Sequence, residues 1–105
     1  MLIRIVKLTL KKENIASFEQ IFEETKSFIR NFEGCLSLEL YQDREHSNIF
    51  FTYSHWEKEE NLDAYRKSEF FRNVWGKTKL LFEEKAEAWS VNRIKSVKQT
   101  YACHI

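Results

Sequence analysis

The chain contains no proline and only 2 glycines among its 105 residues. Without proline- or glycine-rich stretches, low-complexity segments or internal repeats, nothing in it suggests a second domain. Its 2 cysteines, Cys35 and Cys103, match no zinc or redox spacing. Two lone cysteines fit a reducing compartment better than a disulfide scaffold. These scarcities predict a single domain from the cytoplasm.

Long hydrophobic runs and an excess of one charge are also missing. Lys and Arg total 17 against 16 acidic residues, for a net charge of +1, so no basic field attracts a nucleic-acid backbone. No apolar run approaches the roughly 20 residues that span a bilayer. Residues 1–10 alternate in polarity and do not resemble a signal peptide. We therefore expect no nucleic-acid partner and no membrane.

Aromatic residues, by contrast, are abundant. They make up 15% of the chain, with 9 Phe, 4 Tyr and 3 Trp. Rings of this size must fill a core or line a ligand pocket. A chain of this length is also near the lower end of sizes that bury an adequate core alone, so an oligomer interface would help it.

Hydrophobic periodicity predicts four strands and intervening helices. The strands are expected at residues 1–10, 35–42, 49–56 and 85–94, and the helices at residues 15–32, 59–66 and 69–82. Asn14 and Ser68 are plausible N-caps for the first and third helices, and Gly34 is expected to end the first. Gly76 interrupts an apolar stripe, which suggests a close approach or a bend.

This order predicts an α+β fold with the ferredoxin-like β-α-β-β-α-β arrangement, an antiparallel sheet that carries its helices on one face. The other face then lacks a cover, and pairing two such sheets into a shared barrel would supply one. We therefore expect a homodimer with two-fold symmetry. Residues 1–94 are expected to form the domain, and residues 95–105 a C-terminal tail or an arm that reaches a neighbour.

The segments FFTYSHWE at residues 50–57 and LDAYRKSEFF at residues 62–71 resemble the third strand and the following helix of the antibiotic biosynthesis monooxygenase family. IRIVK at residues 3–7 and KAEAWS at residues 85–90 also look like that family. The resemblance covers residues 1–94 and implies a dimeric α+β barrel. The family includes cofactor-independent quinol or anthrone monooxygenases, haem-degrading enzymes and members without known activity.

Three positions separate the chain from the haem-degrading members. Those enzymes use an Asn on the first strand, a Trp before a Lys-Ser step and an iron-binding His on the last helix. The matching residues here are Val6, Tyr65 and Trp75. Valine lacks an amide, and no imidazole remains to bind iron, so the resemblance argues against haem degradation.

Oxygenation without a cofactor needs a flat apolar site, a base and donors that stabilise an oxyanion. The resemblance makes His55, Tyr65 and Trp75 the candidate catalytic residues. His55 is the base candidate because imidazole titrates near neutrality; otherwise it is a half-exposed strand end or packs in the dimer. Tyr65 can hydrogen-bond a substrate oxygen or serve as a core ring, and Trp75 lines or fills the pocket.

Four further residues are candidates for binding substrate: Arg4, Tyr53, Trp56 and Phe71. A charge at Arg4, among apolar neighbours, needs a partner. That partner is a substrate oxyanion or an acid such as Glu39 or Glu87. Tyr53 can bond a substrate oxygen or pack in the core, and Trp56 has a strand-end packing role as its alternative.

The leading hypothesis is a cofactor-independent monooxygenase that acts on a small aromatic or quinol-type compound, with no cofactor and no metal. The first alternative is a non-catalytic small-molecule-binding or stress-response dimer of the same fold. The second is a purely structural dimer whose aromatic residues all belong to the core. A cavity near Trp75 and Tyr65 would favour the first two hypotheses over the third.

Overall fold

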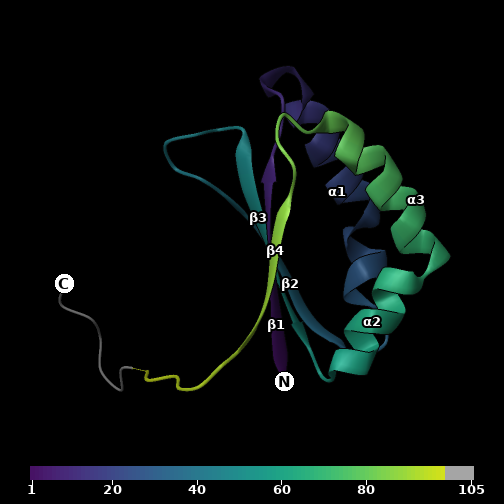
Figure 1. Cartoon of the computed structure of the whole chain (residues 1–105), viewed down its shortest axis with the longest axis vertical. Helices are drawn as coiled ribbons and strands as arrows, with labels where there is room; N and C mark the ends of the chain where they lie inside the picture. Colours follow the sequence, from purple (N-terminus) through teal and green to yellow (C-terminus); the bar gives the residue numbers. More distant parts are fainter. Residues whose placement is uncertain (99–105) are drawn as a thin grey trace.

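The computed structural model describes residues 1–98, in which a four-stranded antiparallel sheet carries its helices on one face (Figure 1). The elements are β1 (Leu2–Thr9), a 3-10 turn (Lys12–Asn14), α1 (Ile15–Arg30), β2 (Cys35–Gln42), β3 (Ile49–Trp56), α2 (Glu59–Lys67), α3 (Glu69–Thr78), a second 3-10 turn (Lys79–Leu81) and β4 (Glu87–Asn92). The predicted ferredoxin-like α+β fold is confirmed.

The strand order is β2-β3-β1-β4, and every neighbouring pair is antiparallel. Successive side chains of a strand point to opposite faces, so cross-strand partners share a face. We call one side the helix-covered face; it includes Arg4, Val6, Leu8, Leu38, Leu40, Phe50, Thr52, Ser54, Trp56, Ala88 and Ser90. We call the other the open face; it includes Ile3, Ile5, Lys7, Glu39, Tyr41, Phe51, Tyr53, His55, Glu87, Trp89 and Val91.

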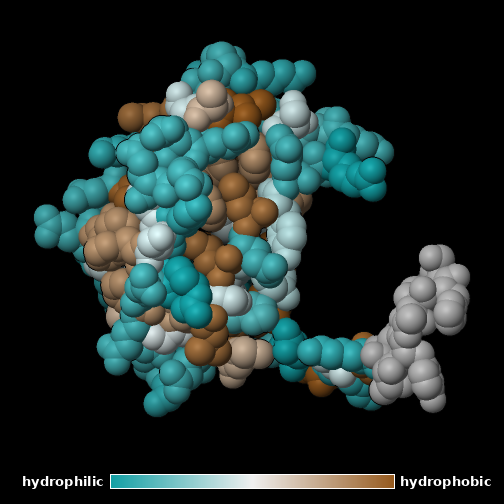
Figure 2. All heavy atoms as spheres, turned by 180° about the vertical axis from the view of Figure 1, so that it is seen from behind, coloured by the Kyte–Doolittle hydropathy of each residue, from teal (hydrophilic) through white to brown (hydrophobic). Residues whose placement is uncertain are grey.

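The core consists of two hydrophobic clusters under the helices. One centres on Leu8, Leu10, Phe18 and Phe50. The other contains Cys35, Trp56 and Leu62. Helix α1 supplies Phe18 from its apolar stripe and α2 supplies Leu62, so each helix buries a narrow face against the sheet. Seen from the side of α1 and β2, hydrophobic residues occupy the seam between helices and sheet, framed by hydrophilic ones (Figure 2).

The ends of the helices agree with the sequence prediction in part. Ser68 caps α3, because its hydroxyl oxygen accepts a hydrogen bond from the Phe71 amide at 3.1 Å. Helix α1 ends at Arg30 with Asn31 as its C-cap, so the helix stops before Gly34, which was expected to end it. Gly34 itself has φ +85, and a Cβ there would collide with the Asn61 side chain. Asn14 occupies the N-cap position of α1 as predicted, but its side chain makes no capping bond and instead donates to the Leu81 carbonyl at 3.3 Å.

Other boundaries differ from expectation. Helix α3 ends at Thr78 and a 3-10 turn follows, whereas the apolar stripe predicted a helix to residue 82. The expected close approach at Gly76 is wrong, because a Cβ there would meet nothing within 4 Å. Residues 93–98 are exposed, have no helix or strand, and lead away from the sheet (Figure 1). The predicted tail at residues 95–105 lies partly outside the described residues and stays a prediction.

In residues 1–98, no helix combines the length and the apolar character that a bilayer crossing requires.

Candidate functional site

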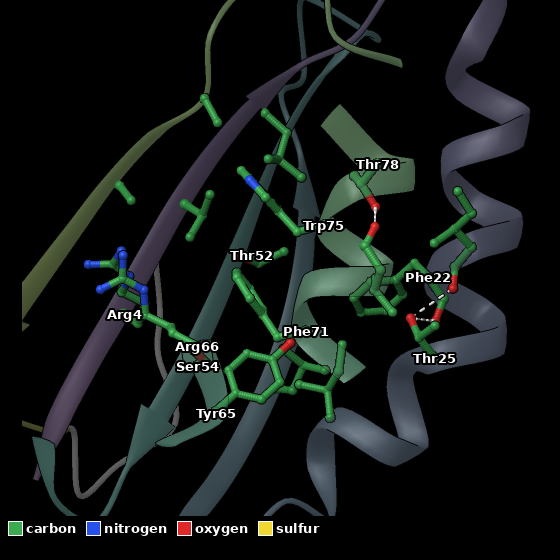
Figure 3. A pocket seen from close by; sticks show the side chains of 18 of the residues that line it. Arg4, Phe22, Thr25, Thr52, Ser54, Tyr65, Arg66, Phe71, Trp75 and Thr78 are labelled. Atoms are coloured by element: carbon green, nitrogen blue, oxygen red, sulfur yellow. Dashed lines mark hydrogen bonds between the residues drawn. The ribbon is translucent and has the colours of Figure 1, made fainter. Parts of the chain in front are cut away.

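A cavity of about 300 Å³ lies between the helix-covered face and the helices (Figure 3). This size is at the lower end of small-molecule pockets. Its floor comes from all four strands, and its walls come from α1, α2 and α3. The third hypothesis, an interior filled entirely by core side chains, therefore does not match the structure.

The floor of the cavity follows from the alternation of β1 and β3. Arg4 pairs with Ser54 and Val6 pairs with Thr52 across the two central strands. All four side chains line the cavity. The floor thus combines small hydroxyl groups, one valine and one guanidinium, which leaves room above it for a flat ligand.

The wall opposite the floor is aromatic. Phe71 and Trp75 are one turn apart on α3 and stack with centroids 5.8 Å apart and planes at 10°. Tyr65 meets Phe71 edge-on with centroids 5.1 Å apart, and it lies 5.2 Å from Trp56. These rings hold one another in place, so the wall is a pre-formed aromatic surface.

Several hydroxyl groups in the cavity are already bonded to protein. Thr25 donates to the Ile21 carbonyl at 2.8 Å, and Thr78 donates to the Val74 carbonyl at 2.7 Å. The Ser54 oxygen accepts a hydrogen bond from Trp56 Nε1 at 3.0 Å, which leaves the Ser54 proton free to be donated. Hydroxyls committed to helix carbonyls contribute little to ligand recognition, so recognition depends on the remaining groups.

Like Thr52, Tyr65 lines the cavity with a hydroxyl that makes no side-chain hydrogen bond within residues 1–98. Its phenol oxygen has no hydrogen bond to any residue in the range 1–98, and Figure 3 shows it directed towards the side of Phe71. Burial raises the pKa of Tyr65 above its ordinary value, and the Cys35 thiol raises it further. The phenol therefore stays protonated at neutral pH and acts as a hydrogen-bond donor rather than a base.

Two arginines enter the cavity. Arg4 donates from Nη1 to the Ser90 hydroxyl at 2.9 Å, and Arg66 lines the same cavity from α2. Desolvation and then the charge of Arg66 lower the pKa of Arg4. The alternative that Arg4 pairs with Glu39 or Glu87 is wrong for this structure. Glu39 belongs to the open face, and Glu87 lies 3.9 Å from Lys7.

Sequence reasoning missed Arg66. It follows Leu62 by four residues and Tyr65 by one, and all three line the cavity from α2. Residues i, i+3 and i+4 share a helix face, so a helical projection around Leu62 and Tyr65 would have placed Arg66 beside them.

The predicted site residues divide between the two faces. Arg4, Trp56, Tyr65, Phe71 and Trp75 all line the cavity. Tyr53 and His55 do not, and the structure therefore corrects their expected grouping with Tyr65 and Trp75. The physical reason is strand alternation, because residues 53 and 55 of β3 point away from the face that carries residues 52, 54 and 56.

On the open face, Tyr53 and His55 form an aromatic row. Tyr53 pairs across the sheet with Ile5 and His55 with Ile3. The Tyr53 and His55 rings lie 5.1 Å apart, and Tyr41 meets Tyr53 at 6.2 Å. His55 Nε2 is buried and has no hydrogen-bond partner among the described residues.

Comparison with known proteins agrees with this geometry. The family model described as antibiotic biosynthesis monooxygenase matches residues 1–75. The chain belongs to the antibiotic biosynthesis monooxygenase family. No curated protein sequence matches it.

Several solved structures share the fold. A crystal structure of an antibiotic biosynthesis monooxygenase is 19% identical with a TM-score of 0.84, and the match covers 90% of this chain and 100% of that one. A conserved protein from Methanosarcina mazei Go1 is 22% identical with a TM-score of 0.83, covering 89% and 93%. SnoaB, a cofactor-independent oxygenase from Streptomyces nogalater, is 15% identical with a TM-score of 0.83, covering 93% and 97%. The TM-scores show a common fold, and at identities this low the likeness shows the fold alone.

The three positions at which the resemblance argued against haem degradation lie at the cavity. Val6, Tyr65 and Trp75 all line it. Its lining among residues 1–98 contains no histidine, cysteine, aspartate or glutamate, and its ionisable groups are Arg4, Tyr65 and Arg66. The cavity thus presents an aromatic surface and hydrogen-bond donors.

Proposed function

We propose that the chain is a cofactor-independent monooxygenase that oxidises a small aromatic or quinol-type compound in the cavity. The observation that carries this proposal is a pre-formed aromatic cavity of about 300 Å³ with uncommitted donors, in a fold of the antibiotic biosynthesis monooxygenase family. The similarity of its fold to that of a cofactor-independent oxygenase supports it.

The chemistry asks little of the protein beyond binding and electrostatics. Dioxygen is a triplet and reacts slowly with closed-shell carbon, but an electron-rich phenolate can transfer one electron to it. A hydroquinone and one dioxygen then give one hydroxyquinone and one water. In this proposal, Phe71 and Trp75 hold the ring, while Tyr65 and Arg4 donate to the substrate oxygen. The helices covering the sheet limit the access of water to the reacting carbon.

Oxygen uptake with a panel of hydroquinones, without added flavin or metal, tests the proposal. Isotopically labelled dioxygen should place its label in the organic product, and one dioxygen should be consumed per hydroquinone. Trp75→Ala and Tyr65→Phe should reduce the rate because they remove a wall and a donor of the cavity. Uptake no faster than with Trp75→Ala would contradict the proposal.

A second candidate is a non-catalytic module that binds the same class of compound, including one that acts in a stress response. The specific observation in its favour is the absence of a carboxylate or imidazole from the cavity lining within residues 1–98, because general-base catalysis normally uses such a group. A compound that raises the melting temperature and is recovered unchanged under dioxygen would favour binding over catalysis.

We also propose that the open face pairs with that of a second copy to form a homodimer. Tyr41, Trp89 and Val91 are 48%, 45% and 39% exposed on this face. Large hydrophobic residues gathered on one exposed surface mark interfaces in soluble proteins. A second sheet would also bury the aromatic row of Tyr53 and His55, in keeping with the expectation that His55 packs in a dimer.

A further inference from the structure

The charges of the cavity are unusual for an apolar site. Arg4 and Arg66 both line it, and no acidic residue among the described residues does. Neither arginine forms an ion pair with a carboxylate within residues 1–98. Two positive charges therefore meet at one site without a negative charge to balance them. Arg4 is partly buried, where a charge is costly unless it is paired, whereas Arg66 is exposed.

The two guanidinium groups have donors to spare. A guanidinium carries five N–H donors, and the single side-chain bond of Arg4 goes to the Ser90 hydroxyl at 2.9 Å. Arg66 makes no side-chain hydrogen bond to any described residue. Figure 3 shows the two arginines together at one end of the cavity, with Tyr65 and Phe71 next to them. This end is thus rich in free cationic donors.

A ligand with a negatively charged oxygen would balance the two positive charges. It would reduce the repulsion between the guanidiniums and accept charge-assisted hydrogen bonds, which are stronger than bonds between neutral groups. The aromatic wall of Tyr65, Phe71 and Trp75 continues from the cationic end, so the complementary ligand has a flat ring system with a negative oxygen at its edge. A free phosphate would leave the aromatic wall without a partner.

We propose that the cavity selects aromatic compounds that bind as anions, with Arg4 and Arg66 receiving a phenolate, enolate or carboxylate oxygen. This inference rests on the proposed function and names its substrate class. It also accounts for a monooxygenase cavity without a base. The two arginines favour the ionised form of an acidic phenol, whose proton leaves to solvent, so no side chain has to remove it. A hydroxyquinone product, also acidic, would bind at the same end.

Binding without turnover provides the test. Naphthoate and naphthamide have the same ring system and nearly the same shape, but only naphthoate is an anion at neutral pH. We expect isothermal titration to give naphthoate an affinity about tenfold higher at low salt, the size typical of one charge-assisted hydrogen bond. The preference should shrink as salt increases. A hydroxynaphthoquinone compared with its methyl ether repeats the test for an enolate oxygen. The two comparisons together show whether the site prefers a carboxylate or an enolate.

Variants connect the preference to the two side chains. Arg66→Gln and Arg4→Gln should each lower naphthoate affinity about tenfold and leave naphthamide affinity unchanged. Arg66 is exposed on α2, so its variant should keep the fold even if Arg4→Gln does not. Arg72→Gln is the matched control, because Arg72 is an exposed helical arginine outside the cavity lining. It should change neither affinity.

Equal affinities for naphthoate and naphthamide, no binding of naphthoate, or equal losses for both ligands in Arg66→Gln would overturn the inference. These outcomes are separate from the failure of the proposed function. Charge-selective binding without oxygen uptake would contradict the proposed monooxygenase activity and support the anion site. Oxygen uptake with neutral and anionic hydroquinones that bind with equal affinity would support the activity and contradict the anion site.

Discussion

The two faces of the sheet are built from alternate residues of the same strands and meet different surroundings. Ser54 and Trp56 lie under the helices, and Trp56 is 1% exposed. Tyr53 and His55 precede them by one residue each and lie on the open face, which no helix of residues 1–98 covers. A step of one residue along β3 therefore separates the lining of the cavity from the proposed contact with a second copy.

The difference also separates two kinds of chemistry. The helix-covered face presents arginine, hydroxyl and indole donors around a cavity. The open face carries the histidine of β3 and a row of aromatic rings, including Tyr41, Tyr53 and Trp89. A histidine near aromatic rings is a reasonable expectation for an active site, but here its neighbours belong to the open face, which we propose as an interface.

Replacing a tryptophan on each face should give the largest contrast in stability. Trp56 packs near Tyr65 and Phe32, with centroids 5.2 Å and 6.4 Å away, and its indole donates to Ser54. Trp56→Ala should lower the free energy of unfolding by about 4 kcal/mol, because it leaves a cavity and removes that bond. Trp89 is 45% exposed, so Trp89→Ala should lower the free energy of unfolding by less than half as much.

Denaturant unfolding at a protein concentration low enough to keep both variants monomeric measures this contrast. Equal losses for Trp56→Ala and Trp89→Ala would mean that the two faces contribute alike to the folded monomer.

A charge on the open face should break the proposed dimer. Trp89→Asp would place a carboxylate in a surface that dimerisation desolvates, so the dissociation constant should rise by about a hundredfold or more. Light scattering after size exclusion measures the molar mass across concentrations. Leu80→Asp is the matched control, since Leu80 is 75% exposed and lies outside the open face. A monomeric wild type, or a Trp89→Asp variant as dimeric as Leu80→Asp, would refute the interface.

Much of the fold was predictable because its signals are local. Period-two and helical patterns located the four strands and the helices. Ser68 indicated the start of α3, because a serine at the N-cap accepts a hydrogen bond from an amide three residues later, here that of Phe71. The end of α3 was not predictable from its apolar stripe. Leu81 and Phe82 continue the pattern and pack against the core, but they do so from a 3-10 turn and the segment after it.

The site was predictable only in part because both faces of β3 carry large apolar residues. Phe51 and Tyr53 alternate with Phe50 and Trp56, so periodicity separates the two sets without indicating which one the helices cover. Asn14 occupies the N-cap position of α1, but the partner of its side chain was not predictable. Its amide bonds to the Leu81 carbonyl, 67 positions away, and no local rule for capping includes a partner from so distant a segment.

Adjacent substitutions on β3 should separate the faces by their effects on ligand binding. Ser54→Ala removes the acceptor of Trp56 Nε1 and leaves a buried donor unsatisfied, which should cost about 1–2 kcal/mol of stability. It should also weaken naphthoate binding, because Trp56 and Ser54 line the cavity. His55→Ala should leave naphthoate affinity unchanged. Isothermal titration of both variants decides this, and a large loss in His55→Ala would restore His55 to the site.

The smallest expected effect concerns the phenol of the helix-covered face. Burial raises the pKa of Tyr65 above its ordinary value of 10.0, so its neutral form is favoured in the folded state. Below about pH 10, Tyr65 is protonated in both the folded and unfolded states, and its contribution to stability is fully present. As the pH rises further, the unfolded chain releases this proton first, and stability falls by up to about 1.4 kcal/mol per pH unit.

Tyr65→Phe should remove that part of the alkaline slope, measured as the free energy of unfolding at a series of pH values. Tyr53→Phe, on the open face, is the comparison variant and should keep it. Identical slopes for wild type and Tyr65→Phe would show that water reaches the Tyr65 hydroxyl freely. The aromatic wall would then not hold this phenol protonated, and its assignment as a donor within a sheltered cavity would fail.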